Sequence, residues 1–229
     1  HASPIVSHGR IYLNPTGGLY CLEDKSKTSG VSAGAPPASE QAVAEDSEAA
    51  HVQVVPADAL LRPGQSQQYT VRLFNQQGQL LKELESGVEF TLQGSGKIDA
   101  AGKYEAAGDT VHSATLVSAR VGDLVGKARI RIVPDLPWKF TFDELTDPPV
   151  TWVGARYRHV VREKDGSNVM VKITTIPKGT RSRCWFGHSE LSNYTIEADV
   201  QGAIANDKLP DIGLIAQGYT MDLQGENQR

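Results

Sequence analysis

The chain has 229 residues, of which 39% are hydrophobic, and its formal net charge is −4. The 23 basic and 27 acidic side chains form no basic face or tail, which argues against a nucleic-acid partner. No apolar run approaches the ~20 residues that a membrane-spanning helix needs, so no membrane span is predicted. The 22 Gly and 12 Pro, together with short alternating runs of β-branched residues, predict an all-β protein.

The first 25 residues predict a group of short strands separated by turns. We expect strands around 5–6, 11–13 and 19–22, with turns at 7–9 and 14–18, where Gly, Pro, Asn and Ser gather. Such short strands cannot bury enough apolar surface to be stable alone, so the sequence predicts that they need neighbouring strands.

The stretch "ASPIVSHGRIYL…GGLYCLE", from Ala2 to Glu23, resembles the repeat of the PQQ-like (quinoprotein-type) β-propellers. The resemblance implies that residues 1–25 are the terminal strands of a propeller blade and that the rest of the propeller is their partner. Because the chain starts at His1 without a methionine, we expect a fragment of a longer protein. PQQ or calcium would then bind only in the upstream propeller, and no cofactor is predicted for this fragment.

Residues 26–50 contain no aromatic residue and few β-branched ones. Their acidic side chains are Glu40, Glu45, Asp46 and Glu48. A segment of this composition cannot bury enough apolar surface to offset the entropy of ordering. We therefore predict a flexible acidic linker.

Residues 51–135 predict a β-sandwich, because short strands alternate with turn signals every 8–12 residues. We expect Tyr69, Val71 and Leu73 to form one core face. We expect a second core face of Ala128, Ile130 and Ile132, which alternate in the sequence with Arg129 and Arg131. The stretches "PGQSQQYTV", "GKIDAAGKY" and "ARIRIV" are similar to the bacterial Ig-like (Big) family. That resemblance implies a spacer or adhesion module without catalytic residues.

Residues 136–229 predict a second sandwich. We expect strands in "PWKFTFDEL", "CWFG", "YTIEADVQGA" and "DIGLIAQGYTMDL", and a hairpin in "WVGARYRHVVREKDGSNVMVKITTI" that turns at 164–167. The order of these strands resembles the concanavalin/laminin-G type of jelly roll. Domains of that type need roughly twice the length present here, so the resemblance implies a partial, truncated jelly roll.

Two acidic residues of this region raise the question of glycoside hydrolysis. Glu197 and Asp199 lie two apart on an expected strand and therefore on one face. Jelly-roll glycosidases use an E-x-D-x-x-E strand, but Gly202 stands at the third position. We expect Ile196, Ala198 and Val200 to form the core face and the two acids to be solvated. The sequence thus predicts no catalytic residue and favours a fragment that is not an enzyme.

Metal and phosphate motifs are incomplete. The six histidines have no metal-ligand spacing, so no metal site is predicted. "GSGK" at 94–97 lacks the other residues of a phosphate-binding loop and indicates a turn. Cys21 and Cys184 belong to no Cys/His motif, and we expect both to be small buried residues rather than a disulfide.

Aromatic and basic residues of the predicted hairpin and the "CWFG" strand are candidates for carbohydrate binding, because a sugar site combines a flat aromatic with hydrogen-bonding side chains. Arg156 and Arg158 share the parity of Arg162 on one expected strand face, which suggests an anion-binding strip for acidic glycans. Packing of the aromatics in a core, and an ordinary solvated strand edge, remain the alternatives. The candidate ligand-binding residues are Trp152, Arg156, Tyr157, Arg158, Trp185 and His188.

Together these observations favour a non-enzymatic scaffold and binding protein, with recognition of a carbohydrate or another cell-envelope component in the C-terminal sandwich. The resemblances imply a bacterial protein that is periplasmic, associated with the outer membrane, or secreted. One alternative is the accessory C-terminal region of a PQQ-dependent oxidoreductase, and a less favoured one is a glycoside hydrolase.

Overall fold

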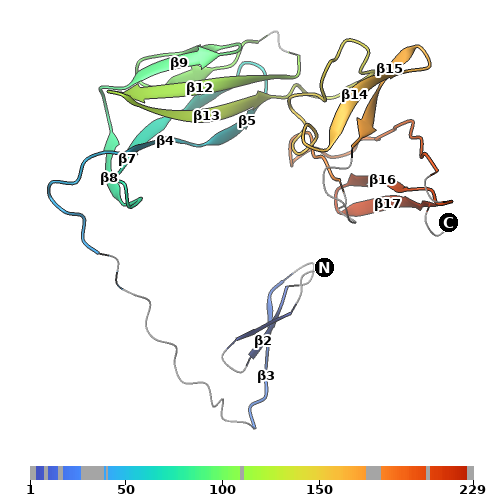
Figure 1. Cartoon of the computed structure of the whole chain (residues 1–229), viewed down its shortest axis with the longest axis horizontal. Helices are drawn as coiled ribbons and strands as arrows, with labels where there is room; N and C mark the ends of the chain where they lie inside the picture. The colour runs from blue at the N-terminus through green and yellow to red at the C-terminus, as the bar shows by residue number, and fades with distance from the viewer. Residues whose placement is uncertain are drawn as a thin grey trace. The chain divides into compact units, whose positions relative to one another are not determined.

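The computed structural model describes residues 4–7, 10–14, 18–26, 39, 41–108, 111–173, 182–204 and 207–225. These residues form 17 β-strands and no α-helix (Figure 1), which confirms the predicted all-β class. None of the sheets in the described part closes into a barrel or a propeller. The chain divides into two compact units, His1–Asp46 and Ser47–Arg229.

The first unit contains an antiparallel sheet of the order β1-β2-β3, built from β1 (Ile5–Ser7), β2 (Arg10–Leu13) and β3 (Tyr20–Glu23). The strands lie where the sequence predicts them. Parts of the two expected turns, residues 8–9 and 15–17, lie outside the described residues, as does most of the predicted linker.

The register of this sheet separates an apolar face from a mixed one. Val6, Ile11 and Leu22 lie side by side across the three strands, and they are 73%, 41% and 53% exposed. Because side chains alternate along a strand, Arg10 and Glu23 project from the opposite face, where they form an ion pair of 3.2 Å. The apolar face of the sheet is thus largely exposed within its unit.

The second unit begins with a β-sandwich. Its larger sheet has the order β5-β13-β12-β9, in which β5 and β13 are parallel and the other pairs are antiparallel. The other two sheets have the orders β4-β7-β8, which Figure 1 shows, and β10-β11-β6. The strands are β4 (His51–Val55), β5 (Asp58–Leu61), β6 (Ser66–Gln68), β7 (Thr70–Phe74), β8 (Leu80–Leu84), β9 (Glu89–Gln93), β10 (Lys97–Ile98), β11 (Lys103–Glu105), β12 (Ser113–Val121) and β13 (Leu124–Ile132).

The core of the sandwich follows the predicted alternation. Tyr69, Val71 and Leu73 are 5% exposed or less, and residues of β13 on the facing side are fully buried. Tyr69, Val71 and the buried residues of β13 join one cluster with Val54, Leu61, Tyr104, Val117 and Ala119 from the other strands. Burial of such a cluster at about 25 cal/mol per Å² of apolar surface is the main stabilising contribution in this part of the chain.

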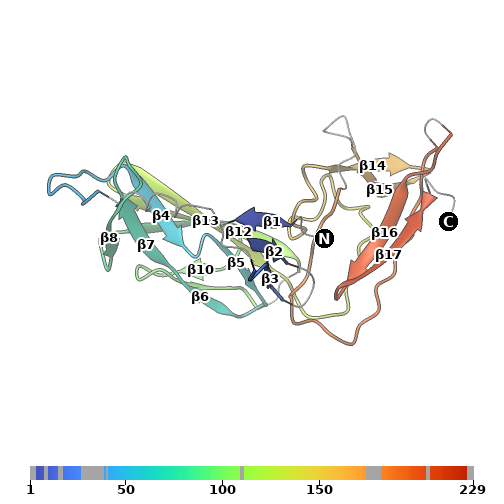
Figure 2. The same cartoon turned by 90° about the horizontal axis from the view of Figure 1, so that it is seen from below.

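The remainder of the second unit contains two separate hairpins (Figure 2). The first pairs β14 (His159–Lys164) with β15 (Ser167–Lys172), and the second pairs β16 (Asp211–Ala216) with β17 (Tyr219–Gln224). Asp165 and Gly166 connect the first pair with φ angles of 52° and 85°, as a type I′ turn requires. The predicted turn at 164–167 is therefore confirmed.

Three strands expected in this region do not form. "PWKFTFDEL" and "YTIEADVQGA" have no strand residues, and "CWFG" contributes one isolated bridge at Trp185. Val200, which we expected to belong to a core face, is 47% exposed. The physical reason is that alternation alone cannot make a strand without a neighbouring strand to complete its hydrogen bonds.

Both cysteines are free, as predicted, but their burial differs from the prediction. Cys21 is exposed, because it lies on a sheet whose faces are not covered within the first unit. Cys184 is partly buried, and burial raises the pKa of its thiol. None of the described segments forms a helix that could span a bilayer.

Candidate functional site

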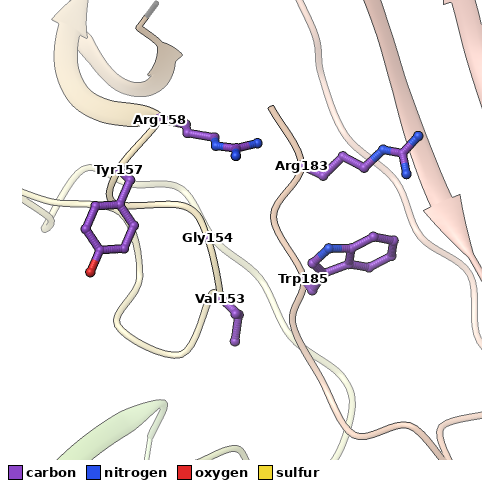
Figure 3. A pocket seen from close by; sticks show the side chains of 6 residues that line it. All are labelled: Val153, Gly154, Tyr157, Arg158, Arg183 and Trp185. Atoms are coloured by element: carbon purple, nitrogen blue, oxygen red, sulfur yellow. The ribbon is translucent and has the colours of Figure 1, made fainter. Parts of the chain in front are cut away.

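An open depression of about 590 Å³ lies in the C-terminal part of the second unit. Its wall comes from two segments that are far apart in the sequence, one before β14 and one around Trp185. Figure 3 shows the side chains that line it, which are Val153, Gly154, Tyr157, Arg158, Arg183 and Trp185. Three of the six candidate binding residues, Tyr157, Arg158 and Trp185, are therefore brought together.

An isolated antiparallel bridge holds the two segments at this depression. The backbone N–H of Val153 donates to the carbonyl of Trp185 at 2.8 Å, and the N–H of Trp185 donates back at 3.0 Å. Bridged residues project to the same side, and Val153 and Trp185 are 46% and 50% exposed. Their chain neighbours Trp152 and Phe186 project to the opposite side.

Those neighbours form the inner support of the site. The rings of Trp152 and Phe186 stack with centroids 4.2 Å apart and planes inclined by 12°. Phe140 meets the Trp152 ring in a T-shaped contact at 5.0 Å, and Trp138 and Phe142 extend the aromatic cluster. Trp152 thus belongs to the aromatic core beneath the depression and not to its lining.

The aromatic cluster reaches the sandwich through His112. The imidazole lies 5.1 Å from the Trp138 ring and 4.9 Å from the Phe140 ring. Its Nδ1 is 3.2 Å from the hydroxyl of Thr151, whereas its buried Nε2 has no hydrogen-bond partner among the described residues. Burial lowers the pKa of His112, because a charged imidazolium loses hydration there.

Tyr157 and Arg158 are positioned by a compact turn that precedes β14. Backbone N–H groups of Arg158 and His159 both donate to the carbonyl of Ala155, which is fully buried. The carbonyl of Arg158 accepts from Ile173 at 2.8 Å. Tyr157 is 80% exposed at the rim.

The arginine strip expected from strand parity does not exist. Arg156 and Arg158 lie in this turn, whereas Arg162 lies in β14, which begins only at His159. Nε of Arg156 donates to the carbonyl of Pro148 at 3.1 Å, and Arg156 is not part of the lining. Consecutive hydrogen-bonded turns, with their different side-chain directions, replace the strand that parity requires.

His188 also lies away from the depression. It is 8% exposed, and its Nε2 lies 2.9 Å from the carbonyl of Val133, at the end of the sandwich. Trp138 Nε1 donates to the neighbouring carbonyls of Pro134 and Asp135 at 3.1 and 3.0 Å. The hydrogen bond of His188 therefore connects the C-terminal part to the sandwich, and His188 is not among the residues that line the depression.

A charged contact accompanies this attachment. Nε of Arg62 donates to Asp135 at 2.8 Å, and another nitrogen of the same guanidinium donates to Glu190 at 2.7 Å. The hydrogen bond from Arg62 lowers the pKa of Glu190. These two acids lie close in space although they are distant in sequence.

Arg183 is the charged lining residue that sequence reasoning missed. It stands two positions before Trp185, so an extended chain places both side chains on one side. Figure 3 shows the side chains of Arg183 and Trp185 extending to the same side of their segment. The two-residue spacing of Arg183 and Trp185 in "RCW" was the available signal. This spacing does not tell which side of the segment faces the depression, because that depends on the bridge at Trp185.

The two acids considered for hydrolysis, Glu197 and Asp199, are exposed in a segment without strand structure. The register that would place them on one strand face is absent, and neither lines the depression. Across the described ranges, no three His, Cys, Asp or Glu side chains gather in an arrangement that could hold a metal ion.

Comparisons with known proteins add little to this geometry. No protein-family model matches the chain, and no curated protein matches it. Two solved structures of the surface layer protein SbsC are similar to it at a TM-score of 0.28 each. Domains 1–6 show 12% identity over 80% of this chain and 22% of that one. Domains 4–9 show 17% identity over 77% of this chain and 27% of that one, so the chain spans roughly a quarter of either solved chain.

Proposed function

We propose that this chain is a non-enzymatic scaffold and binding part of a secreted or envelope protein of a bacterium, and that the depression at Trp185 recognises a carbohydrate. The observation that carries the proposal is the exposure of two aromatic rings in one concave surface. Trp185 is 50% and Tyr157 80% exposed, and both line the depression.

Exposed aromatic rings of this kind suit the apolar faces of sugar rings. Tryptophan and tyrosine bury a large flat area, and each retains a polar group that can form a hydrogen bond at the edge. The bridge between Val153 and Trp185 fixes the backbone from which the indole projects before any ligand arrives. Such preorganisation lowers the entropic cost of binding.

The other parts of the chain fit a scaffold role. The sandwich of residues 51–133 buries its apolar side chains in one cluster, which is what a spacer module requires. We propose that it is a bacterial Ig-like module and that β1–β3 are the terminal strands of a PQQ-like propeller blade. The sequence stretches quoted above support both assignments.

Binding of defined oligosaccharides to the full chain and to two alanine variants tests the carbohydrate proposal. Titration calorimetry is carried out with neutral and acidic oligosaccharides from plant and bacterial cell walls. We expect Trp185→Ala and Tyr157→Ala to weaken binding about tenfold or more, equivalent to about 1.4 kcal/mol.

Tyr219→Ala is the matched control, since Tyr219 is 82% exposed on β17 and does not line the depression. This variant should bind like the unaltered chain. Absence of binding to every oligosaccharide, or an equal loss in the Tyr219 variant, would contradict the proposal. Hydrolysis of a bound glycan that is abolished in Glu197→Gln would show that the chain is an enzyme after all.

A further inference from the structure

The hairpin of β16 and β17 (Figure 2) has one apolar face. Three cross-strand pairs of its register project to the same side, because side chains alternate along a strand. These pairs are Ile212 with Leu223, Leu214 with Met221, and Ala216 with Tyr219. The hairpin therefore presents a continuous row of apolar side chains on one side.

This apolar face is partly covered over β16 and open over β17. Ile212 and Leu214 of β16 are partly buried. The three residues of β17 are more exposed, Tyr219 at 82%, Met221 at 56% and Leu223 at 49%. A two-stranded hairpin is at best marginally stable alone, and a contiguous apolar patch exposed on a protein marks a surface for interaction. The side of the hairpin that lacks a neighbour is therefore the side of β17.

A segment of the same chain accompanies β16. The side-chain amide of Gln217, just after β16, donates to the carbonyl of Leu191. A Cβ added at Gly202 would lie 3.0 Å from the side chain of Pro210, just before β16. Residues 191–202 thus contact the chain at both ends of β16. Among the residues that the structure describes, β17 has a strand neighbour on the β16 side only.

We infer that β17 pairs along this open edge with β17 of a second copy of the chain, so that the two hairpins form one continuous antiparallel sheet. The pairing goes beyond the proposed function and does not depend on the depression at Trp185. Residues that flank a two-residue hairpin loop exchange backbone hydrogen bonds, so Tyr219 and Met221 direct their N–H and C=O groups to β16. Thr220 and Asp222 consequently direct theirs to the open edge, where a second strand can bond to them.

Register and charge favour a second copy as the partner of this edge. A two-fold axis at Met221 places Tyr219 opposite Leu223 and Thr220 opposite Asp222, so apolar residues meet apolar ones and the carboxylate meets a hydroxyl. An axis at Asp222 would instead bring two like charges together, which destabilises a strand pair. The strand also lacks Lys and Pro, the residues with which exposed edges avoid such pairing.

Sedimentation velocity of the full chain at increasing concentration tests the pairing. We expect an equilibrium between monomer and dimer. Met221→Lys places two like charges opposite each other at the axis and should weaken the dimer at least tenfold. Val125→Lys is the matched control, because Val125 is 43% exposed on β13 of the sandwich, and this variant should dimerise like the unaltered chain.

Two further variants distinguish lost pairing from an unfolded hairpin. Because position 221 faces its own counterpart, a mixture of Met221→Lys and Met221→Glu should form a heterodimer although each variant alone is monomeric. Thr220→Pro removes an N–H at the open edge and none that bonds to β16, so it should abolish the dimer and retain the hairpin. Amide signals of β16 in the ¹⁵N spectrum of the monomeric variant report whether the hairpin persists.

A chain that remains monomeric at every concentration overturns the inference. A dimer that persists in both Met221→Lys and Thr220→Pro forms through another surface and overturns it as well. If the chain is monomeric and its β17 amide signals shift with a peptide of residues 194–201, the open edge accepts that segment and the pairing of two β17 strands is wrong. Rescue of the dimer in the mixture of the two Met221 variants supports both the partner and the register.

Discussion

The indole of Trp152 stacks on the ring of Phe186, with centroids 4.2 Å apart, directly behind the bridge that joins Val153 to Trp185. The two contacts lie on opposite sides of the same pair of segments. One side is closed by aromatic packing, and the other side lines the depression. The stability of the aromatic cluster and the shape of the candidate site should therefore change together.

Phe186→Ala should destabilise this part of the chain. The substitution removes the stack on Trp152 and the contacts with Phe140 and Trp138. Because the Phe186 side chain is 37% exposed, we expect a loss of about 2 kcal/mol, below the 3–5 kcal/mol of a fully buried phenylalanine. Urea denaturation, monitored by tryptophan fluorescence, measures this loss in the free energy of unfolding.

Tyr157→Ala is the control for that experiment, because it removes an exposed ring from the same depression. Its effect on the free energy of unfolding should remain within about 0.5 kcal/mol. An unchanged unfolding transition in Phe186→Ala would show that the stack does not hold the two segments together.

His112 should make the second unit less stable in mild acid. Burial lowers the pKa of its imidazole below the ordinary 6.5, so the unfolded chain takes up a proton at a higher pH than the folded one. Stability is therefore lost as the pH falls from the ordinary value towards the lowered one.

Free energies of unfolding at about pH 7.5 and about pH 5 test this expectation. His112→Gln should reduce the difference between the two conditions, whereas His51→Gln, a change at an exposed position of β4, should leave it as it is. The same pH dependence in the His112 variant and the unaltered chain would contradict the expected role of burial.

The contact between Arg62 and Glu190 should respond to both acid and salt. Arg62 lowers the pKa of Glu190, so the stabilisation is fully present above the ordinary glutamate value of 4.5 and is lost as the pH falls through the lowered value. We expect Glu190→Gln to reduce the urea midpoint at neutral pH, and the reduction should disappear near pH 3 or in about 1 M NaCl.

Glu197→Gln makes the same charge change at an exposed position and should leave the midpoint unaltered. If Glu190→Gln lowers the midpoint equally at neutral and acidic pH, the glutamate acts through packing and not through its charge.

The sandwich could be predicted from the sequence because its strands have one buried and one exposed face. Tyr69 and Val71 are buried as expected, and Ile130 is fully buried between an exposed Arg129 and a partly buried Arg131. Alternation of apolar and polar residues in a sequence directly indicates a strand with one buried face. It failed in "YTIEADVQGA", where no neighbouring strand completes the ladder, and Val200 remains 47% exposed.

The candidate site was predictable in its chemistry but not in its geometry. Aromatic and basic residues close together in the sequence indicated Tyr157, Arg158 and Trp185, with packing of the aromatics in a core as the alternative. His188 lies away from the depression and Arg183 lines it because of contacts between residues far apart in the chain. One such contact is the hydrogen bond between His188 and the Val133 carbonyl. Local spacing carries no information about these contacts.

The indole N–H signals of the three tryptophans provide the most direct test of the proposed site. The indole of Trp138 donates to backbone carbonyls and that of Trp152 is buried, whereas Trp185 is 50% exposed in the depression. In titrations of the ¹⁵N-labelled chain with the neutral and acidic oligosaccharides used for calorimetry, the Trp185 signal should shift and saturate with at least one of them while the other two signals stay in place. An unmoved Trp185 signal, or equal shifts of all three, would contradict a ligand site at Trp185.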